Sequence, residues 1–199
     1  MRGGTVFHML RCITGLGVPK SQTTAGERAV LQKYSMGKRR GVEIGVYEGV
    51  TTCLIAEELA DDGILYSIDP FLKGRIGICW GKLIATTMIQ RSGLQERVRL
   101  VEKYSYEAAD CITGQFDFIF VDGDHSLQGI SRDWADWSRR VSPGGVLALH
   151  DTQAVASNPD VAGLGSVEYF DSQIRHDDRF EIVEQVDSLS VLVRRGGAC

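Results

Sequence analysis

The sequence predicts an α/β protein with a doubly wound, mostly parallel sheet. Short apolar runs alternate with stretches of helical periodicity from residue 24 onward, and repeated βα units favour parallel strands joined by right-handed crossovers. A glycine-rich turn, Gly45 to Gly49, follows the first apolar run, and two further runs close the chain as a strand pair. With 199 residues and no composition break, we expect one domain spanning 1–199.

The net charge, the apolar runs and the cysteines disfavour several classes of partner and location. The net charge is −4, which does not suggest a nucleic-acid partner. There is no apolar run of 18 residues, and Arg11 interrupts the mildly apolar start, so we expect neither a membrane span nor a secretory signal. Five scattered cysteines without a C-x-x-C pair favour reduced thiols in a cytoplasmic protein.

The first 23 residues form an N-terminal arm whose structure and role the sequence does not define. Its glycines and Pro19 are expected to break any long helix. The arm is interpreted as a lid over the site, a dimer contact or a poorly ordered terminus. After it, Thr24 and Glu27 have capping-box spacing, which predicts a helix from Thr24 to about Ser35.

The central motif is the stretch from Val42 to Thr52, interpreted as a buried strand, a turn and a helix N-terminus. Its spacing, E-x-G-x-x-x-G from Glu43, differs from the G-x-G-x-x-G of dinucleotide sites. Asp69 ends the next strand 20 residues after Gly49, where open α/β sheets place the carboxylate that holds a ribose diol. These features fit S-adenosylmethionine better than NAD. Glu43 supplies an acid for a cationic tail, Asp69 supplies a ribose site, and the turn lacks the glycine pattern that binds a pyrophosphate.

The remaining elements follow in a regular order. Helices are expected near 50–60, 79–91, 127–140 and 167–175, and strands near 64–69, 97–101, 116–121, 146–149, 180–186 and 190–193. Four successive strand ends carry acids, hydroxyls or the glycine turn: Glu43/Gly45, Asp69, Tyr104/Ser105 and Asp122. In an open parallel sheet these residues converge on one crevice at the carboxyl edge.

Four segments, 43–49, 67–70, 118–125 and 142–151, resemble class I S-adenosylmethionine-dependent methyltransferases. The resemblance covers roughly residues 24–195. It is nearest to the small single-domain group that includes macrocin-type sugar O-methyltransferases. It implies a Rossmann-like sheet of seven strands with the last strand antiparallel.

The resemblance also implies a cofactor site. Gly45 and Gly49 would pass under the methionine part, Glu43 would orient that part, and Asp69 would bind the ribose hydroxyls. Tyr104 and Ser105 would border the adenine. The full set of expected cofactor residues is Glu43, Gly45, Tyr47, Gly49, Asp69, Tyr104, Ser105 and Asp122.

Catalytic roles follow from the same resemblance. Asp122 and Asp151 match two acids that bind a divalent ion in metal-dependent members, and oxygen ligands suit Mg²⁺. His125 matches a catalytic base, so His125 and Asp122 are the expected catalytic residues. Where some members have a further acid, this chain has His150. The alternative is that 122–125 forms only a turn and helix cap, with both histidines in ordinary hydrogen bonds.

The function expected is methylation of a small molecule, on a hydroxyl and with Mg²⁺ assistance. A hydroxyl is a weak nucleophile at neutral pH and needs a base or a metal. The alternatives are an NAD-dependent oxidoreductase and a non-catalytic module that binds S-adenosylmethionine. We expect a small-molecule substrate, no nucleic-acid or membrane partner, and a homodimer through the arm.

Overall fold

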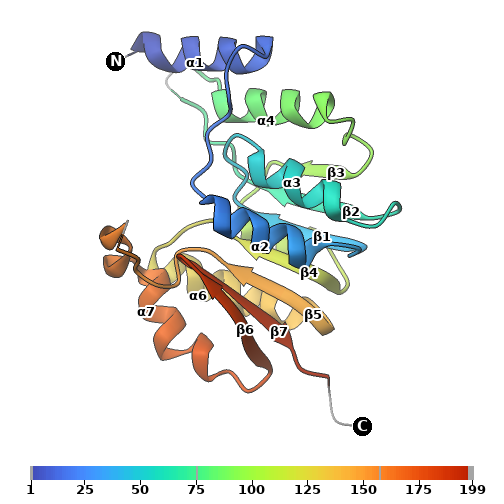
Figure 1. The fold of residues 1–199 in the computed structure, drawn as a ribbon, viewed down its shortest axis with the longest axis vertical. Coiled ribbons are helices and arrows are strands. Elements are labelled where there is room, and N and C mark those ends of the chain that lie inside the picture. The colour runs from blue at the N-terminus through green and yellow to red at the C-terminus, as the bar shows by residue number, and fades with distance from the viewer. Residues whose placement is uncertain (1, 75, 157, 197–199) are drawn as a thin grey trace.

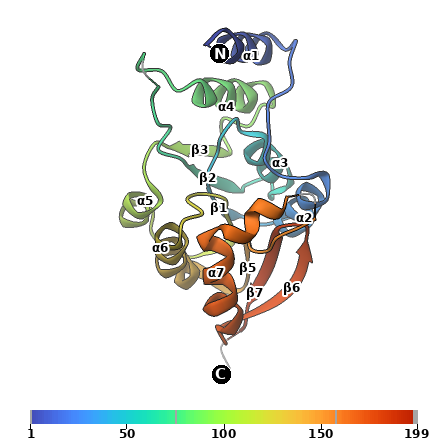
Figure 2. The same cartoon turned by 90° about the vertical axis from the view of Figure 1, so that its left-hand side faces the viewer.

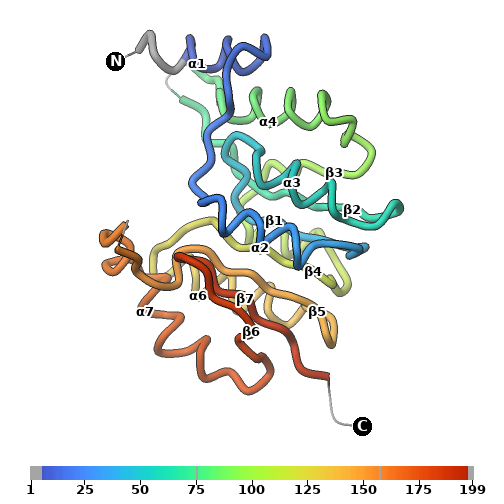
Figure 3. Tube along the Cα trace, viewed as in Figure 1, coloured from blue at the N-terminus to red at the C-terminus, as the bar shows by residue number. Residues whose placement is uncertain are grey.

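The computed structural model describes residues 2–74, 76–156 and 158–196, with side chains from residue 6 onward (Figure 3). Its centre is one seven-stranded sheet in the order β3-β2-β1-β4-β5-β7-β6. The pairs among β1 to β5 are parallel, and β7 is antiparallel to both β5 and β6. The predicted doubly wound sheet with an antiparallel last strand is confirmed.

The strands are short and close to their predicted positions. Their bounds are β1 Arg40–Ile44, β2 Ile64–Ile68, β3 Val98–Val101, β4 Phe116–Val121, β5 Val141–Leu149, β6 Phe180–Val186 and β7 Leu189–Arg194. The prediction for β5 was too short at its start. Residues 143–145 were assigned to a turn, but they lie within the strand, beside a register shift between Phe116 and Phe118.

Helices cover both faces of the sheet (Figures 1 and 2). The α-helices are α1 Arg2–Thr14, α2 Ala25–Ser35, α3 Val50–Glu58, α4 Trp80–Arg91, α5 Ser105–Cys111, α6 Leu127–Trp137 and α7 Gly165–Ser172, and the short 3₁₀ helices are η1 Ser138–Arg140, η2 Pro159–Gly163 and η3 Ile174–His176. Helices α2, α3 and α4 pack side by side on one face, and α5, α6 and α7 on the other.

Two predictions about helices were wrong. The arm contains a 13-residue helix, α1, which packs against α4 at the far end of the molecule (Figure 1). Early glycines lower helix propensity but do not forbid a helix that buries an apolar face. Met9 and Cys12 supply that face by packing with Ile84 of α4. Helix α5 was missed because Ser105 was assigned only to a strand end.

The core consists of two apolar layers separated by the sheet. Trp134 and Trp137 of α6 pack in one layer with Val42 and Ile44 of β1. Leu31 of α2 and Ile55 of α3 pack in the other. The carboxyl ends of β1 to β5 meet at one edge of the sheet, and the polar residues after them lie there together.

Candidate functional site

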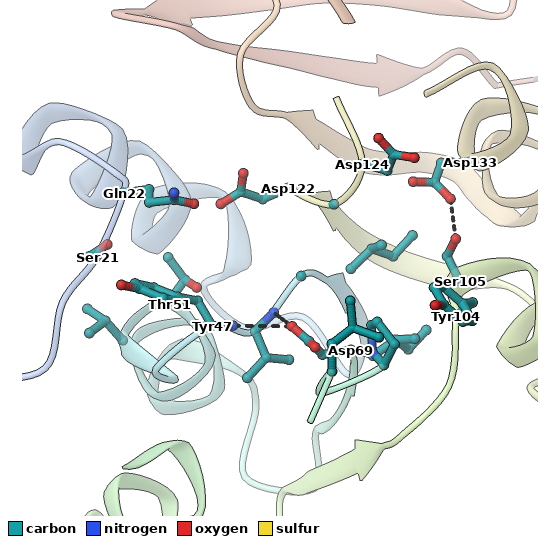
Figure 4. Close-up of a pocket in the computed structure, with 18 of the residues that line it drawn as sticks. Ser21, Gln22, Tyr47, Thr51, Asp69, Tyr104, Ser105, Asp122, Asp124 and Asp133 are labelled. Carbon is teal, nitrogen blue, oxygen red and sulfur yellow. Dashed lines mark hydrogen bonds between the residues drawn. The ribbon is translucent and has the colours of Figure 1, made fainter. Parts of the chain in front are cut away.

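A cavity of about 500 Å³ opens at the carboxyl edge of the sheet (Figure 4). It is lined by the glycine turn and by residues that follow β2, β3 and β4. Of the expected cofactor residues, the lining includes Gly45, Tyr47, Asp69, Tyr104, Ser105 and Asp122. Residues 20–22 of the arm also line it, so this part of the arm reaches the site although α1 does not.

Asp69 ties the glycine turn to the end of β2. Its Oδ2 accepts hydrogen bonds from the backbone N–H of Val46 at 3.0 Å and of Tyr47 at 3.4 Å (Figure 4). Its Oδ1 accepts from the N–H of Phe71 at 2.7 Å. The carboxylate therefore fixes the turn and faces the cavity, where its remaining lone pairs can accept hydrogen bonds from a diol.

The turn requires glycine because protein atoms occupy the space beside it. Gly45 has φ +92°, and a Cβ there would lie 1.9 Å from the carbonyl oxygen of Asp122. Gly49 has φ +82°, and a Cβ would lie 2.9 Å from Ala85 of α4. From the sequence, both glycines were expected to allow a positive φ and to leave room for a ligand, and the positive φ is confirmed. The structure shows that strand and helix packing also demand them.

Glu43 does not line the cavity. It is fully buried beneath the first turn of α3, where the hydroxyls of Thr51 and Thr52 each donate a 2.6 Å hydrogen bond to its carboxyl group. Burial raises the pKa of Glu43 to about 7, against the lowering effect of these hydroxyls. Its expected contact with the cofactor stays a prediction, and its observed contacts hold the α3 N-terminus against β1.

The opposite side of the cavity is closed by α5 and α6. Ser105 at the start of α5 donates a hydrogen bond to Asp133 of α6 (Figure 4). Asp133 is 3% exposed, and burial raises its pKa to about 6. Tyr104, 44% exposed, borders the same side. Asp133 was not among the site residues expected from the sequence. The available signal was an acid on the apolar stripe of α6, between Ile130 and Trp134.

Next to the cavity, Asp122, His125, His150 and Asp151 form one cluster. His125 Nε2 lies 3.5 Å from Asp122 Oδ1, and its Nδ1 lies 3.6 Å from Asp151 Oδ2. His150 Nδ1 lies 3.1 Å from Asp122 Oδ1 and 3.5 Å from Asp151 Oδ1. Each imidazole therefore faces both carboxylates, and Asp122 belongs to the cluster as well as to the cavity wall.

Glu27 of α2 is the buried anchor of this cluster. It is 1% exposed, and its Oε2 lies 3.3 Å from His150 Nε2. Its Oε1 accepts hydrogen bonds from the backbone N–H and the hydroxyl of Ser188. The sequence argument recognised Glu27 only as a helix cap. It does cap α2, through the N–H of Thr24, but it also contacts a histidine 123 residues away.

The charges in the cluster stabilise one another. Burial opposes ionisation of Asp122 and His150, but their mutual attraction lowers the pKa of Asp122 and raises that of His150. The carboxylate of Asp122, 3.5 Å from His125 Nε2, raises the pKa of His125 against the effect of burial. For Glu27, burial raises the pKa, but contacts with His150, Thr24 and Ser188 outweigh it and lower the value to about 2. His150 therefore acts as an internal cation among three carboxylates.

The cluster offers donors to a divalent ion. Ligand atoms of Asp122, His125 and His150 all lie within 4.8 Å of one another. Asp122 Oδ1 and His150 Nδ1 are buried and 3.1 Å apart but not aligned for a hydrogen bond, and neither atom has a hydrogen-bond partner among the residues that the structure describes. Carboxylate oxygens suit Mg²⁺, whereas nearby imidazoles also suit Mn²⁺ and other transition metals. This set fits a divalent ion only where its imidazoles are neutral, and it does not include Asp151, the second expected ligand.

Comparison with solved structures identifies the fold. An O-methyltransferase from Bacillus cereus, in complex with SAH, has a TM-score of 0.67 at 20% identity, covering 96% of this chain and 91% of its own. TomG from Streptomyces achromogenes, an O-methyltransferase involved in tomaymycin synthesis and solved with SAM, has a TM-score of 0.66 at 17% identity, with 96% and 90% covered. PaMTH1, a methyltransferase from Podospora anserina bound to SAH, has a TM-score of 0.69 at 16% identity, with 96% and 88% covered.

Sequence comparison gives a curated relative and a family. An uncharacterized protein of Acanthamoeba polyphaga mimivirus is 27% identical over 125 residues, which are 60% of this chain and 54% of the viral protein. The chain therefore spans about half the length of that relative. A family model described as a methyltransferase domain matches residues 42–152, which include the glycine turn and reach past Asp151. Because this match covers more than half of the chain, the protein belongs to the methyltransferase domain family.

Proposed function

We propose that this methyltransferase transfers a methyl group from S-adenosylmethionine to a hydroxyl of a small molecule. The observation that carries the proposal is the position of Asp122. Its side chain contributes to the wall of the 500 Å³ cavity and also contacts the two histidines. A cofactor seated in the cavity therefore lies next to the groups that can accept a proton.

The cavity suits the cofactor in size and chemistry. Asp69 presents carboxylate oxygens for a ribose diol, and Ile44, Ile68 and Leu72 supply apolar walls. Tyr104 and Ser105 lie where an adenine would meet α5. When bound, S-adenosylmethionine supplies an electrophilic methyl on a sulfonium. The chain's own task is to hold the acceptor oxygen in line with that methyl, which is mainly a matter of orientation.

His125 is the proposed base. It is a quarter exposed and lies between Asp122 and Asp151, whereas His150 is 5% exposed and held by Glu27. A neutral His125 nitrogen accepts the hydroxyl proton as the oxygen takes the methyl, and the neighbouring carboxylates stabilise the imidazolium formed. His150 instead keeps Asp122 and Asp151 in place.

Asp122 and Asp151 are the proposed ligands of Mg²⁺ or a similar ion. The ion, when bound, would lower the pKa of a coordinated hydroxyl. His150 occupies the position of an acid found in some relatives and already supplies positive charge there. Three carboxylates surround this one cation, so negative charge remains for a divalent ion to neutralise, and we expect metal to assist the reaction. Activity that survives a strong chelator without any loss would contradict this assignment.

The other functions considered fit the molecule less well. Membership of the methyltransferase domain family argues against an NAD-dependent oxidoreductase, as does the missing third glycine. A net charge of −4 disfavours a nucleic-acid substrate. No helix in the described part of the chain is long and apolar enough to cross a membrane. The macrocin-type specificity, the homodimer and the cytoplasmic location stay predictions.

The proposal is tested by calorimetry followed by a substrate screen. We expect the purified protein to bind S-adenosylmethionine and not NAD. A screen of sugars and phenols with the labelled cofactor would then identify acceptors by transfer of the label. Absence of S-adenosylmethionine binding would refute the cofactor assignment. Transfer confined to amines or nucleic acid would refute the acceptor class.

The base is tested separately with the best acceptor. His125→Ala should lower kcat by roughly 10²- to 10⁴-fold, the usual contribution of a positioned acid–base group, while cofactor affinity stays unchanged. His176→Ala changes an exposed histidine of η3 and should leave kcat unchanged. Full activity of the His125 variant would exclude the base role.

A further inference from the structure

A second cluster of ligand-type side chains lies outside the cavity, where α1 meets the glycine turn. It consists of His8 and Cys12 of α1 and Glu48 of the turn, and their donor atoms all lie within 4.8 Å of one another. Nothing in the proposed methyl transfer uses these residues. His8 and Cys12 are four residues apart, so they project from the same face of the helix.

The separation of His8 and Cys12 is that of two ligands on a tetrahedral metal ion, whereas His8 and Glu48 lie at hydrogen-bond distance. His8 Nε2 lies 3.6 Å from Cys12 Sγ and 2.9 Å from Glu48 Oε2. Two ligands on one zinc ion, with a Zn–N bond near 2.0 Å and a Zn–S bond near 2.3 Å, are about 3.5 Å apart at the tetrahedral angle. Small side-chain shifts would therefore bring all three donors around one ion.

Burial supports the same conclusion. Cys12 is 3% exposed and Glu48 is 6% exposed, so a thiol sulfur and a carboxylate are withdrawn from water at one point. The carboxylate already accepts a 2.6 Å hydrogen bond from the backbone N–H of Lys20. This hydrogen bond orients one carboxylate oxygen, as hydrogen bonds from neighbouring groups usually orient the ligands of a metal ion. One thiolate, one carboxylate and one neutral imidazole would neutralise a divalent cation.

We propose that His8, Cys12 and Glu48 form a binding site for a thiophilic divalent metal such as Zn²⁺. A sulfur ligand excludes Mg²⁺ and Ca²⁺ as preferred ions. The site is separate from Asp122 and Asp151. It joins α1 to the turn that carries Tyr47, a residue of the cavity wall. Its expected role is structural: it fastens the arm to the cofactor loop.

The simpler interpretation is a hydrogen-bonded His8–Glu48 pair beside a packed cysteine. Cobalt spectroscopy separates the two, because Co²⁺ replaces Zn²⁺ and gives a near-ultraviolet charge-transfer band only when a thiolate binds it. The full-length protein is stripped with a chelator under reducing conditions and titrated with Co²⁺. We expect the band to saturate near one equivalent and to disappear when Zn²⁺ is added.

Variants locate the metal. Cys12→Ser should abolish the band. His8→Asn should weaken Co²⁺ binding at least tenfold, and this second variant tests the site independently if Cys12→Ser fails to fold. Cys53→Ser removes another buried cysteine, outside the cluster, and should keep the band. The Asp122 cluster contains no sulfur and cannot produce it. Absence of the band in the unmodified protein, or its persistence in Cys12→Ser, would overturn the proposal.

Discussion

The two halves of the candidate site are built in different ways. The cofactor half consists of the glycine turn and Asp69, and its contacts are mainly between one carboxylate and nearby backbone N–H groups. The histidine half consists of Asp122, His125, His150 and Asp151 with Glu27 behind them, and its contacts are between side chains from separate elements. The first half joins residues 22 and 23 positions apart in the sequence, whereas the second joins residues up to 123 positions apart.

Because the two halves are held by different kinds of contact, we expect them to respond differently to mutation. Backbone contacts depend on the course of the chain, so the cofactor half should be sensitive to glycine substitution and tolerant of many side-chain changes. Side-chain contacts among buried charges depend on every partner being present. The halves meet where Gly45 passes the backbone of Asp122, so a change at that point should damage both.

The largest effect is expected for Gly45→Ala. The added Cβ would lie 1.9 Å from the Asp122 carbonyl oxygen at a residue with φ +92°. Strain and overpacking together should lower the free energy of unfolding by about 4 kcal/mol. Urea denaturation measures this loss, and calorimetry should show S-adenosylmethionine binding lost with it.

Gly37→Ala is the matched control for that variant. Gly37 also has a positive φ, +69°, but an added Cβ would meet no atom within 4 Å. This variant should lower the free energy of unfolding by only about 1 kcal/mol, the cost of placing alanine in the left-handed region, and cofactor binding should be intact. Equal losses for the two variants would show that the contact between the two halves contributes nothing.

The same division explains what the sequence could predict. The positions of the strands along the chain and the residues around the turn follow from apolar periodicity and local spacing, and Asp69 follows from its place after a strand. Glu27 could not be assigned to the site, because its partner His150 is brought close only when α2 packs beside the end of β5. Helix α1 was missed for a similar reason, since its stability comes from packing on α4 rather than from its glycine-containing sequence.

A second prediction concerns Glu43, which lies beneath the cofactor half. Its folded-state pKa is raised to about 7 from an ordinary 4.5, so between these pH values the unfolded chain loses a proton that the folded chain keeps. The free energy of unfolding should therefore fall as pH rises through this window, by up to about 3 kcal/mol.

Glu43→Gln removes this titration while keeping the side-chain shape. Urea denaturation at pH 5 and pH 8 should show the variant gaining most of about 3 kcal/mol relative to the unmodified protein as pH rises. Glu57→Gln, at an exposed position of α3, should show no such gain. A pH-independent difference for Glu43→Gln would mean that the buried carboxyl does not titrate in this range.

Among the variants of the candidate site, the smallest effect on stability is expected for Glu27→Gln, which changes the histidine half and the cap of α2. The amide keeps the size of the side chain but removes the charge facing His150, and hydrogen bonds to a charged partner contribute about 2 kcal/mol. His150 retains Asp122 and Asp151 as neighbours, so the fold should persist. We expect kcat to fall while the dissociation constant of S-adenosylmethionine stays within twofold, because Asp69 and the turn are untouched. Parallel loss of cofactor affinity and kcat would instead mean that the two halves behave as one unit.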